Sequence, residues 1–453
     1  MTTPLDSLIL SDAALESDQM DKLVYDAVFG DDDTKAHARW AIWESGQRVG
    51  TRPASIWPLY HARGEGKFGG FTVPAINVRG LTYDTARCVF RTARRMDAGA
   101  FILEIARSEI GYTDQRPAEY SAVILGAALR EGFRGPVFIQ GDHFQVNSKK
   151  FATDPATEVG AVKHLAREAV AAGFFNIDVD TSTLVDISKP TIPEQQRLNY
   201  EVSADIVSYV RTLQPTGVTI SLGGEIGEVG MHNSTPDELT AYMDGFLAAT
   251  PKGMVGLAKI SVQTGTSHGG VVLPDGSIAD VKLDLEVLET LSKLARERYG
   301  MAGAVQHGAS TLPDNAFHNF PKREACEIHL ATNFMNMLYD HLPDALRQQM
   351  YEWLRVNAKD ERKPSDTDEQ FFYKTRKKAL GPFKKAIWDI PAESKALLTA
   401  AYDAKFGFLF EQLKVPGTAA VVRRFVEAPV LHRSGPEDGG RIIAAPDDTD
   451  LSD

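Results

Sequence analysis

Short apolar runs alternate with longer helix-forming stretches through the middle of this chain. The apolar runs span residues 71–78, 100–106, 136–140, 174–179, 217–222, 257–262, 302–306 and 327–330. Helices are predicted between them at residues 84–97, 117–131, 157–172, 194–213, 236–249 and 283–298. Runs that are apolar throughout are typical of parallel strands buried on both faces. Eight such strands separated by helices predict an α/β fold, a (β/α)8 TIM barrel.

Polar side chains stand at or just beyond the carboxyl ends of nearly all of these runs. They are Asn77, Glu104, Asp142, His143, Asp178, Glu225, His268, His307 and His329. In a TIM barrel the active site is built at the C-terminal ends of several strands. A doubly wound open sheet would instead collect its site at one switch point. The spread of polar residues over so many strands therefore favours the barrel.

The predicted barrel domain spans residues 66–335, with helical segments on both sides. Residues 1–65 are charged and helix-prone, and we interpret them as an N-terminal helical segment packed outside the barrel. Residues 336–430 are also charged and helical, which predicts a C-terminal helical extension for packing or oligomer contacts. Residues 431–453 end in a stretch rich in Gly, Pro and Asp and are predicted to form a disordered tail.

The composition narrows the class of protein. A chain of 453 residues with 43% hydrophobic residues can bury a large core. Its net charge of −12 argues against nucleic-acid and anionic-membrane partners, although a local basic pocket could still hold a phosphate. The two cysteines, Cys88 and Cys326, argue against a disulfide scaffold and a cysteine-based zinc site, and are expected to be buried thiols. With no signal pattern and no membrane-length apolar run, a cytoplasmic location is expected.

Three histidines carry the first chemical hypothesis. His143, His268 and His307 each follow a different apolar run. Three neutral imidazoles around one Zn²⁺, with a position left open for substrate or water, form a catalytic zinc site. The alternative is three unrelated, hydrogen-bonded histidines, but their common place at adjoining strand ends favours the metal.

Small residues beside these histidines suggest a phosphate site. Gly269 and Gly308 directly follow His268 and His307, so that backbone N–H groups could approach an anion closely. Ser310 and Thr332 add hydroxyl donors. The loops after the last strands of a TIM barrel commonly hold a phosphate. Alternatively, the glycines only serve tight turns.

Carboxylates next to the histidines are candidate acid–base groups. Asp142 precedes His143 and could exchange a proton with a substrate hydroxyl beside the metal. Alternatively it only holds a histidine tautomer. Glu225 and Glu228 lie in a glycine-rich stretch after the fifth run, where either could be a base, a further metal ligand or a solvated loop charge.

Read in chain order, these residues resemble the class II, metal-dependent fructose-bisphosphate aldolases. The matching pieces are Pro-Ala-Ile-Asn-Val (74–78), Asp-His (142–143), Ile-Asp (177–178), Gly-Glu-Ile-Gly (224–227), Gly-Thr-Ser-His-Gly (265–269), His-Gly-Ala-Ser (307–310) and Leu-Ala-Thr (330–332). The resemblance covers roughly residues 60–335, and more weakly the aromatic and basic stretch 371–378. Asp-His and Gly-Thr-Ser-His-Gly in this order are its specific part.

The resemblance implies a homodimeric or larger enzyme that cleaves a ketose bisphosphate, with fructose 1,6-bisphosphate as the expected substrate. The products would be dihydroxyacetone phosphate and glyceraldehyde 3-phosphate, formed through a zinc-stabilised enediolate, with a monovalent cation as a further possible ion. His143, His268 and His307 match the metal ligands, and Asp142 matches the residue that moves the C4 hydroxyl proton. Further matches are Gly269, Gly308, Ser310 and Thr332 to the phosphate-binding positions and Asn77 to a substrate-side asparagine. A Schiff-base mechanism on Lys259 would leave the histidines unexplained.

Three departures from the family pattern affect the expected substrate contacts. The usual mobile-loop carboxylate is missing or replaced by Glu228, and His329 stands where the family has asparagine. Arg107 follows the position of a serine near the distal phosphate and could bind an anionic group there. A different phosphoketose, such as tagatose 1,6-bisphosphate, is therefore an alternative substrate. A non-catalytic, aldolase-like subunit that stabilises a partner is the alternative function.

Overall fold

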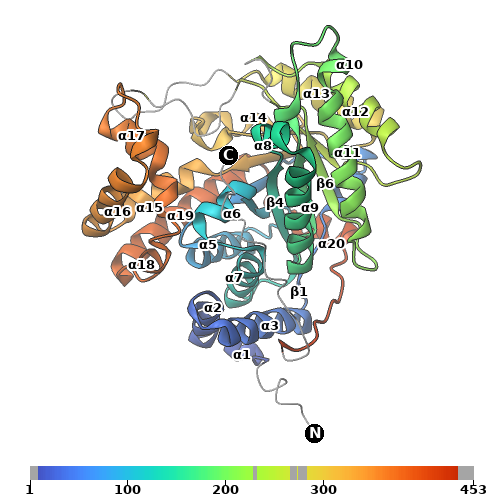
Figure 1. Ribbon diagram of the computed structural model, residues 1–453. Helices are drawn as coiled ribbons and strands as arrows, with labels where there is room; N and C mark the ends of the chain where they lie inside the picture. Colours follow the sequence, from blue (N-terminus) through green and yellow to red (C-terminus); the bar gives the residue numbers. More distant parts are fainter. Residues whose placement is uncertain (1–8, 228–231, 266–272, 274–282, 437–453) are drawn as a thin grey trace.

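The computed structural model describes residues 9–227, 232–265, 273 and 283–436, and its centre is a closed barrel of parallel strands (Figure 1). The eight strands are β2 (Val73–Asn77), β3 (Ile102–Ala106), β4 (Gly135–Gln145), β5 (Asn176–Asp180), β6 (Ser221–Glu225), β7 (Lys259–Val262), β8 (Ala304–Gln306) and β9 (Glu327–Leu330). Each pairs in parallel with the next, and β9 returns to β2. The predicted (β/α)8 TIM barrel is confirmed.

Helices follow the strands and cover the outside of the barrel. The main ones are α5 (Thr82–Arg95), α7 (Pro117–Arg130), α9 (Pro155–Ala172), α11 (Arg197–Thr212), α12 (Pro236–Ala249), α13 (Leu285–Tyr299) and α15 (Thr332–His341). The ends of α9 show why they form where they do. The Asp154 side chain accepts a hydrogen bond from the Thr157 N–H, and Gly173 ends the helix with a left-handed φ of 98°.

Two strands differ from their predicted ranges in ways that matter for the site. The run at 217–222 predicted the fifth barrel strand, but β6 begins at Ser221 and includes Gly223. A Cβ at Gly223 would lie 2.3 Å from Asp178 Oδ1, so only glycine leaves room for that carboxylate. Strand β4 continues beyond the predicted 136–140 to Gln145. Its register with β5 shifts between Gly141 and Phe144, around a left-handed His143 with φ of 40°.

The barrel interior consists of layers of side chains from alternate strand positions. The bottom layer is apolar, with Val73, Ile102 and Phe138 in one cluster. The middle layer is charged and polar, and the top layer holds most of the residues singled out at the strand ends. The middle layer comprises Glu104, Gln140, Asp178, Lys259 and Glu327, all buried. Since period-2 alternation sends every second side chain inward, runs that read as apolar still place polar groups inside.

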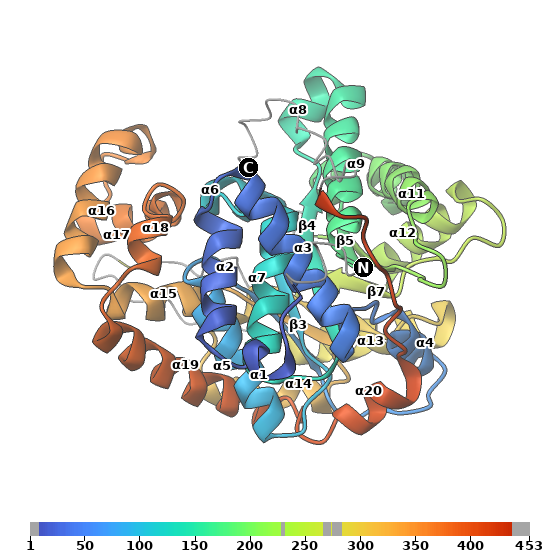
Figure 2. The same cartoon turned by 90° about the horizontal axis from the view of Figure 1, so that it is seen from below.

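The N-terminal segment contains helices and also one strand. Helices α2 (Asp18–Phe29) and α3 (Asp32–Val49) lie against α7, as Figure 2 shows from below. The short strand β1 (Thr51–Pro53) then pairs in parallel with the start of β4, with Thr51 opposite Gly135. Helix α4 (Trp57–Gly64) packs with α20 (Ala419–Phe425) at the bottom of the barrel. The prediction of a purely helical segment missed β1.

The C-terminal helices stand to one side of the barrel (left in Figure 1). They comprise α16 (Asp344–Asn357), α17 (Asp368–Thr375), a 3-10 turn η6 (Arg376–Ala379), α18 (Lys384–Trp388) and α19 (Ala392–Gln412). Helix α19 packs against α5 and α15. Among the described residues, no helix combines the length and the apolar character needed to cross a bilayer.

The prediction of a disordered tail from residue 431 onwards places its start too early in the chain. The Trp43 indole N–H donates a hydrogen bond of 2.6 Å to the Leu431 carbonyl oxygen, and the Arg433 guanidinium lies 3.6 Å from the centre of the Trp43 ring. Glu44 accepts from the Arg433 backbone N–H at 2.7 Å. Residues 431–433 therefore pack on α3, because aromatic and charged partners far away in the sequence hold them there.

Candidate active site

A cavity of about 620 Å³ opens at the C-terminal end of the barrel. Most of the described site residues predicted from the sequence line it, namely Asn77, Asp142, His143, His307, Gly308, Ser310, His329 and Thr332. Glu228, His268 and Gly269 lie outside the described residues. The topology thus brings together side chains that are up to 255 positions apart in the chain, between residues 77 and 332.

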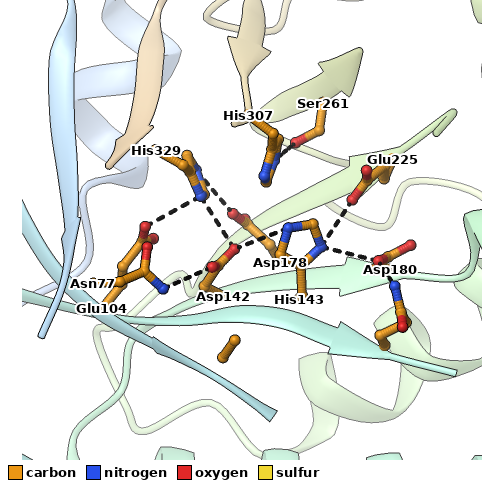
Figure 3. A network of polar contacts seen from close by, with 12 residues as sticks. Asn77, Glu104, Asp142, His143, Asp178, Asp180, Glu225, Ser261, His307 and His329 are labelled. Atoms are coloured by element: carbon orange, nitrogen blue, oxygen red, sulfur yellow. Dashed lines mark hydrogen bonds and ion pairs between the residues drawn. The ribbon is translucent and has the colours of Figure 1, made fainter. Parts of the chain in front are cut away.

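His143 and His307 form the centre of the candidate metal site. The two rings lie 4.4 Å apart, centre to centre. His143 Nδ1 is 2.9 Å from Asp180 Oδ2 and 3.2 Å from Glu225 Oε2, and His307 Nε2 is 2.8 Å from Ser261 Oγ (Figure 3). The left-handed backbone of His143 turns its ring towards β6 and β8, although such a φ is costly for a residue with a Cβ.

Three overlapping groups of side chains in this region could hold a metal ion. One group combines His143 and His307 with Glu225, and a second combines Asp142, His307 and His329. In each group the potential ligand atoms lie within 4.8 Å of one another. The third group, Glu104, Glu327 and His329, lies deeper. Imidazole nitrogens with one carboxylate oxygen form a donor set that suits Zn²⁺, so the residues present fit the predicted metal.

Asp142 is held as a buried carboxylate at the edge of the metal site. Its Oδ2 accepts a hydrogen bond of 2.9 Å from Asn77 Nδ2, and its Oδ1 lies 3.1 Å from His329 Nδ1. Burial by itself raises the pKa of Asp142, but the imidazoles of His143 and His329 outweigh burial and hold the pKa well below its usual value. Asp142 is therefore ionised at neutral pH and able to accept a proton.

The candidate phosphate site lies next to His307, just beyond the ends of β8 and β9. Gly308 adopts a left-handed φ of 65° and leads into the 3-10 turn η3 (Ala309–Thr311), which contains Ser310. Thr332 is the first residue of α15. The N-terminus of a helix presents unpaired N–H groups and a positive dipole end, which favour an anion. This placement agrees with an anion beside the metal site.

The comparison with known proteins now identifies the family. A sequence model described as fructose-bisphosphate aldolase class-II matches residues 64–394. The chain belongs to the class II fructose-bisphosphate aldolase family. No curated protein matches the sequence.

Solved structures share the barrel at low sequence identity. The fructuronate-tagaturonate epimerase UxaE from Cohnella laeviribosi is 12% identical with a TM-score of 0.53, over 77% of this chain and 82% of that one. A probable tagatose 6 phosphate kinase from Sinorhizobium meliloti 1021 is 15% identical with a TM-score of 0.50, over 78% and 99%. Fructose-bisphosphate aldolase from Campylobacter jejuni is 16% identical with a TM-score of 0.47, over 81% and 98%. The two similarities with TM-scores of 0.53 and 0.50 establish a common fold.

His329, which replaces the asparagine expected for a class II aldolase, lies between the top and middle layers. Its Nδ1 faces Asp142, and its Nε2 is 2.6 Å from Glu327 Oε1. Burial lowers the pKa of His329, but the carboxylates of Glu104 and Asp142 outweigh it and raise the pKa well above the usual value. Because a carboxylate can only accept, both ring nitrogens carry hydrogen, and the imidazole is a buried cation.

Arg107 does not line the cavity. Its guanidinium lies 2.5 Å from Glu158 Oε1 and donates a hydrogen bond of 2.6 Å to the Gln145 carbonyl oxygen. Arg107 begins α6 (Arg107–Thr113), a helix that the sequence pattern did not predict. The Arg107 guanidinium, which was expected to face a distal anion, is therefore paired with Glu158 instead.

The sequence reasoning missed a group of basic and aromatic residues that also line the cavity. They are Arg79, Tyr112, Tyr373, Lys374 and Lys377. Arg79 pairs with Glu109 at 2.5 Å, and Lys374 pairs with Asp366 at 2.7 Å. The Lys377 ammonium lies 5.4 Å from the centre of the Tyr112 ring. The weak resemblance at 371–378 was the one signal for this group.

Proposed function

We propose that this chain is a zinc-dependent aldolase that cleaves a ketose bisphosphate into dihydroxyacetone phosphate and an aldehyde. Fructose 1,6-bisphosphate is the expected substrate. The observation that carries the proposal is the meeting of three parts in one cavity. They are a donor set suited to zinc, an ionised Asp142 beside it, and the candidate anion site formed by Gly308, Ser310 and Thr332.

The metal would be held by His143 and His307, together with the predicted ligand His268. Glu225 forms one group of potential ligands with His143 and His307, which supports a role on the metal side for this carboxylate. When bound, zinc supplies Lewis-acid stabilisation for the negative charge that develops as the C3–C4 bond breaks. Asp180 Oδ2 and Ser261 Oγ orient the two imidazoles from outside this set.

Asp142 performs the proton transfer at the C4 hydroxyl. As the C3–C4 bond breaks, its carboxylate takes the hydroxyl proton, C4 becomes the aldehyde carbon, and the bonding electron pair remains on the C3 fragment. In the condensation direction the same proton returns to the new C4 oxygen. Asn77 and His329 hold the two carboxylate oxygens in place during this step. Glu225 and Glu228 are the two candidates that the sequence offers for the proton donor to the C3 fragment.

Two groups of residues in the cavity lining suit a substrate with two anionic groups. Gly308, Ser310 and Thr332 would bind the phosphate of the dihydroxyacetone phosphate half. In the second group, Lys377 has no acidic side chain within ion-pair distance among the residues that the structure describes, so its charge is available to a second phosphate. This supports a bisphosphate and favours an acceptor aldehyde that is itself phosphorylated.

The test uses the purified full-length chain. Its metal content is measured, and cleavage of fructose 1,6-bisphosphate, tagatose 1,6-bisphosphate and fructose 1-phosphate is assayed before chelation, after EDTA, and after addition of Zn²⁺. We expect bound zinc, loss of cleavage with EDTA, recovery with zinc, and a preference for a bisphosphate. A zinc-loaded protein that cleaves none of these sugars, or cleavage that ignores chelation, would contradict the proposal and favour the non-catalytic subunit.

A further inference from the structure

The middle layer of the barrel is unusual because it is charged and almost completely buried. Glu104, Gln140 and Glu327 have no exposed surface, Lys259 is 1% exposed and Asp178 is 5% exposed. Interiors of TIM barrels are normally filled by branched apolar side chains. Buried ion pairs are costly to desolvate and are often no more stabilising than apolar residues of the same volume. A charged layer directly beneath the cavity therefore calls for a role other than stability.

Lys259 is the centre of this layer. Its ammonium donates a hydrogen bond of 2.9 Å to Gln140 Oε1 and another to Glu327 Oε1, and it forms an ion pair with Asp178 Oδ2 at 2.9 Å. These partners come from β5, β4 and β9, so one side chain joins three strands. Lys259 is thus held beneath the cavity by two hydrogen bonds and an ion pair.

A chain of polar contacts leads from Lys259 up to the proposed catalytic carboxylate. Glu327 accepts from Lys259 and also from His329 Nε2 at 2.6 Å. Tyr60 and Gln140 donate the remaining hydrogen bonds to Glu327. Because these hydrogen bonds fix the Glu327 carboxylate, they also fix the orientation of the His329 ring that contacts it. The Nδ1 of His329 is then directed at Asp142 Oδ1, 3.1 Å away (Figure 3).

We propose that Lys259 is a positioning residue, which acts through Glu327 and His329 to fix the orientation of the Asp142 carboxylate. The inference rests on the proposed role of Asp142 as the group that moves the C4 hydroxyl proton. It differs from a purely structural role, in which Lys259 only balances buried carboxylates. It also differs from a nucleophilic role, since Lys259 does not line the cavity.

The decisive variant removes both charges of one pair at once. In K259M/E327Q one positive and one negative charge are lost, so the net charge of the layer is unchanged, but His329 Nε2 loses its carboxylate acceptor and the side chain at position 327 is no longer held by an ammonium. We expect a folded protein with wild-type metal content, a kcat at least about tenfold lower, and a KM within about threefold of wild type. The matched control, K384M/E119Q, removes an ion pair between Lys384 and Glu119 that lies away from the cavity, and should keep wild-type kcat.

A double-mutant cycle shows whether the effect passes through Asp142. In a D142N background the additional K259M/E327Q change should cause no further loss of kcat, because the residue that it positions is already inactive. A folded K259M/E327Q protein with wild-type kcat would overturn the proposal, and so would an equal further loss in the D142N background. If the double variant does not fold, K259R keeps the charge but alters the donor geometry. We expect it to lower kcat without raising KM, and an unchanged kcat would again overturn the proposal.

Failure of the proposed function is recognised separately. A wild-type protein that cleaves no sugar phosphate contradicts the aldolase proposal before any variant is compared. In that event a crystal structure of K259M/E327Q still tests the positioning, since it reports directly whether Asp142 keeps its contact with His329. A retained contact overturns the inference, and a reoriented carboxylate supports it.

Discussion

The substitution of Asp142 by asparagine tests the central step of the proposed reaction. The amide has the shape of the carboxylate but cannot accept the C4 hydroxyl proton. General acid–base catalysis by a positioned side chain contributes about 10²–10⁴-fold, which corresponds to about 3–5 kcal/mol of activation free energy. We therefore expect kcat for bisphosphate cleavage to fall by about that factor.

The contacts of Asp142 indicate that the variant should fold. The amide oxygen can still accept from Asn77 Nδ2, as Oδ2 does at 2.9 Å. The amide nitrogen then replaces Oδ1 and faces the His329 Nδ1–H, so one charge-assisted hydrogen bond is lost. The loss of such a bond costs about 1.5–3 kcal/mol of unfolding free energy. His143 and His307 are unchanged, and the metal content should therefore equal that of the wild type.

Two assays separate proton transfer at C4 from the other steps. Cleavage is measured with a coupled dehydrogenase that reduces the released dihydroxyacetone phosphate. Exchange of the carbon-bound hydrogen of dihydroxyacetone phosphate with D₂O is measured by NMR. Because exchange requires the metal and a different base, it should stay within about threefold of wild type in D142N while cleavage is lost. The control is D244N, an exposed aspartate of α12. A D142N protein that cleaves within threefold of wild type, or that loses its metal, would refute the reasoning.

Three further predictions concern other parts of the molecule. K377M should raise KM for a bisphosphate about tenfold, roughly the effect of one lost charge contact, and leave KM for a monophosphate unchanged. The control K378M should change neither KM value, because the Lys378 ammonium pairs with Glu361. Equal KM changes for both substrates in K377M would contradict the assignment. Burial raises the pKa of Cys326 to about 12 and also raises that of Cys88, so a thiol reagent at pH 8 should label both only after denaturation. Burial would raise the pKa of Glu327, but the ammonium of Lys259 and the imidazole of His329 outweigh burial and lower the pKa to about 2. Because the pKa is lower in the folded than in the unfolded protein, Glu327 stabilises the fold above about pH 4.5. This contribution is lost as the pH falls towards 2. Urea unfolding should therefore show a steeper loss of stability on acidification for the wild type than for E327Q, and parallel curves would contradict it.

Some of the structure could be predicted because it depends on local pattern. The six predicted helices lie within three residues of α5, α7, α9, α11, α12 and α13. Their ends are set by neighbouring residues, such as the Asp154 cap and the left-handed Gly173. Asp142, His143 and His307 could be found because polar groups at the ends of buried strands conflict with the apolar pattern around them. Their meeting in one cavity followed from the barrel topology, which was itself predicted from the repeat of strands and helices.

Other features had no local signal. Strand β1 is only three residues long and forms because Thr51 finds a partner at Gly135. Strand β6 begins at Ser221 and includes Gly223, a residue type that is poor at forming strands, because the Asp178 side chain fills the space beside it. Arg107 was expected to face an anion, but Glu158, 51 positions later in the chain, takes up its charge.

The sequence by itself determined the barrel, the alternation of its strands and helices, and most of the described candidate residues that line the cavity, because strand and helix periodicity and breaks in that periodicity are properties of neighbouring residues. Tertiary structure alone decided the partners of charged groups. Lys259 reads as one lysine in an apolar run, and only the closed barrel gives it Asp178, Gln140 and Glu327 as neighbours. Lys377 similarly lines the cavity only because α17 and η6, the turn that contains Lys377, pack beside the barrel. In a low-dielectric interior the nearest charges decide what an ionisable group does, and sequence separation carries no information about that distance.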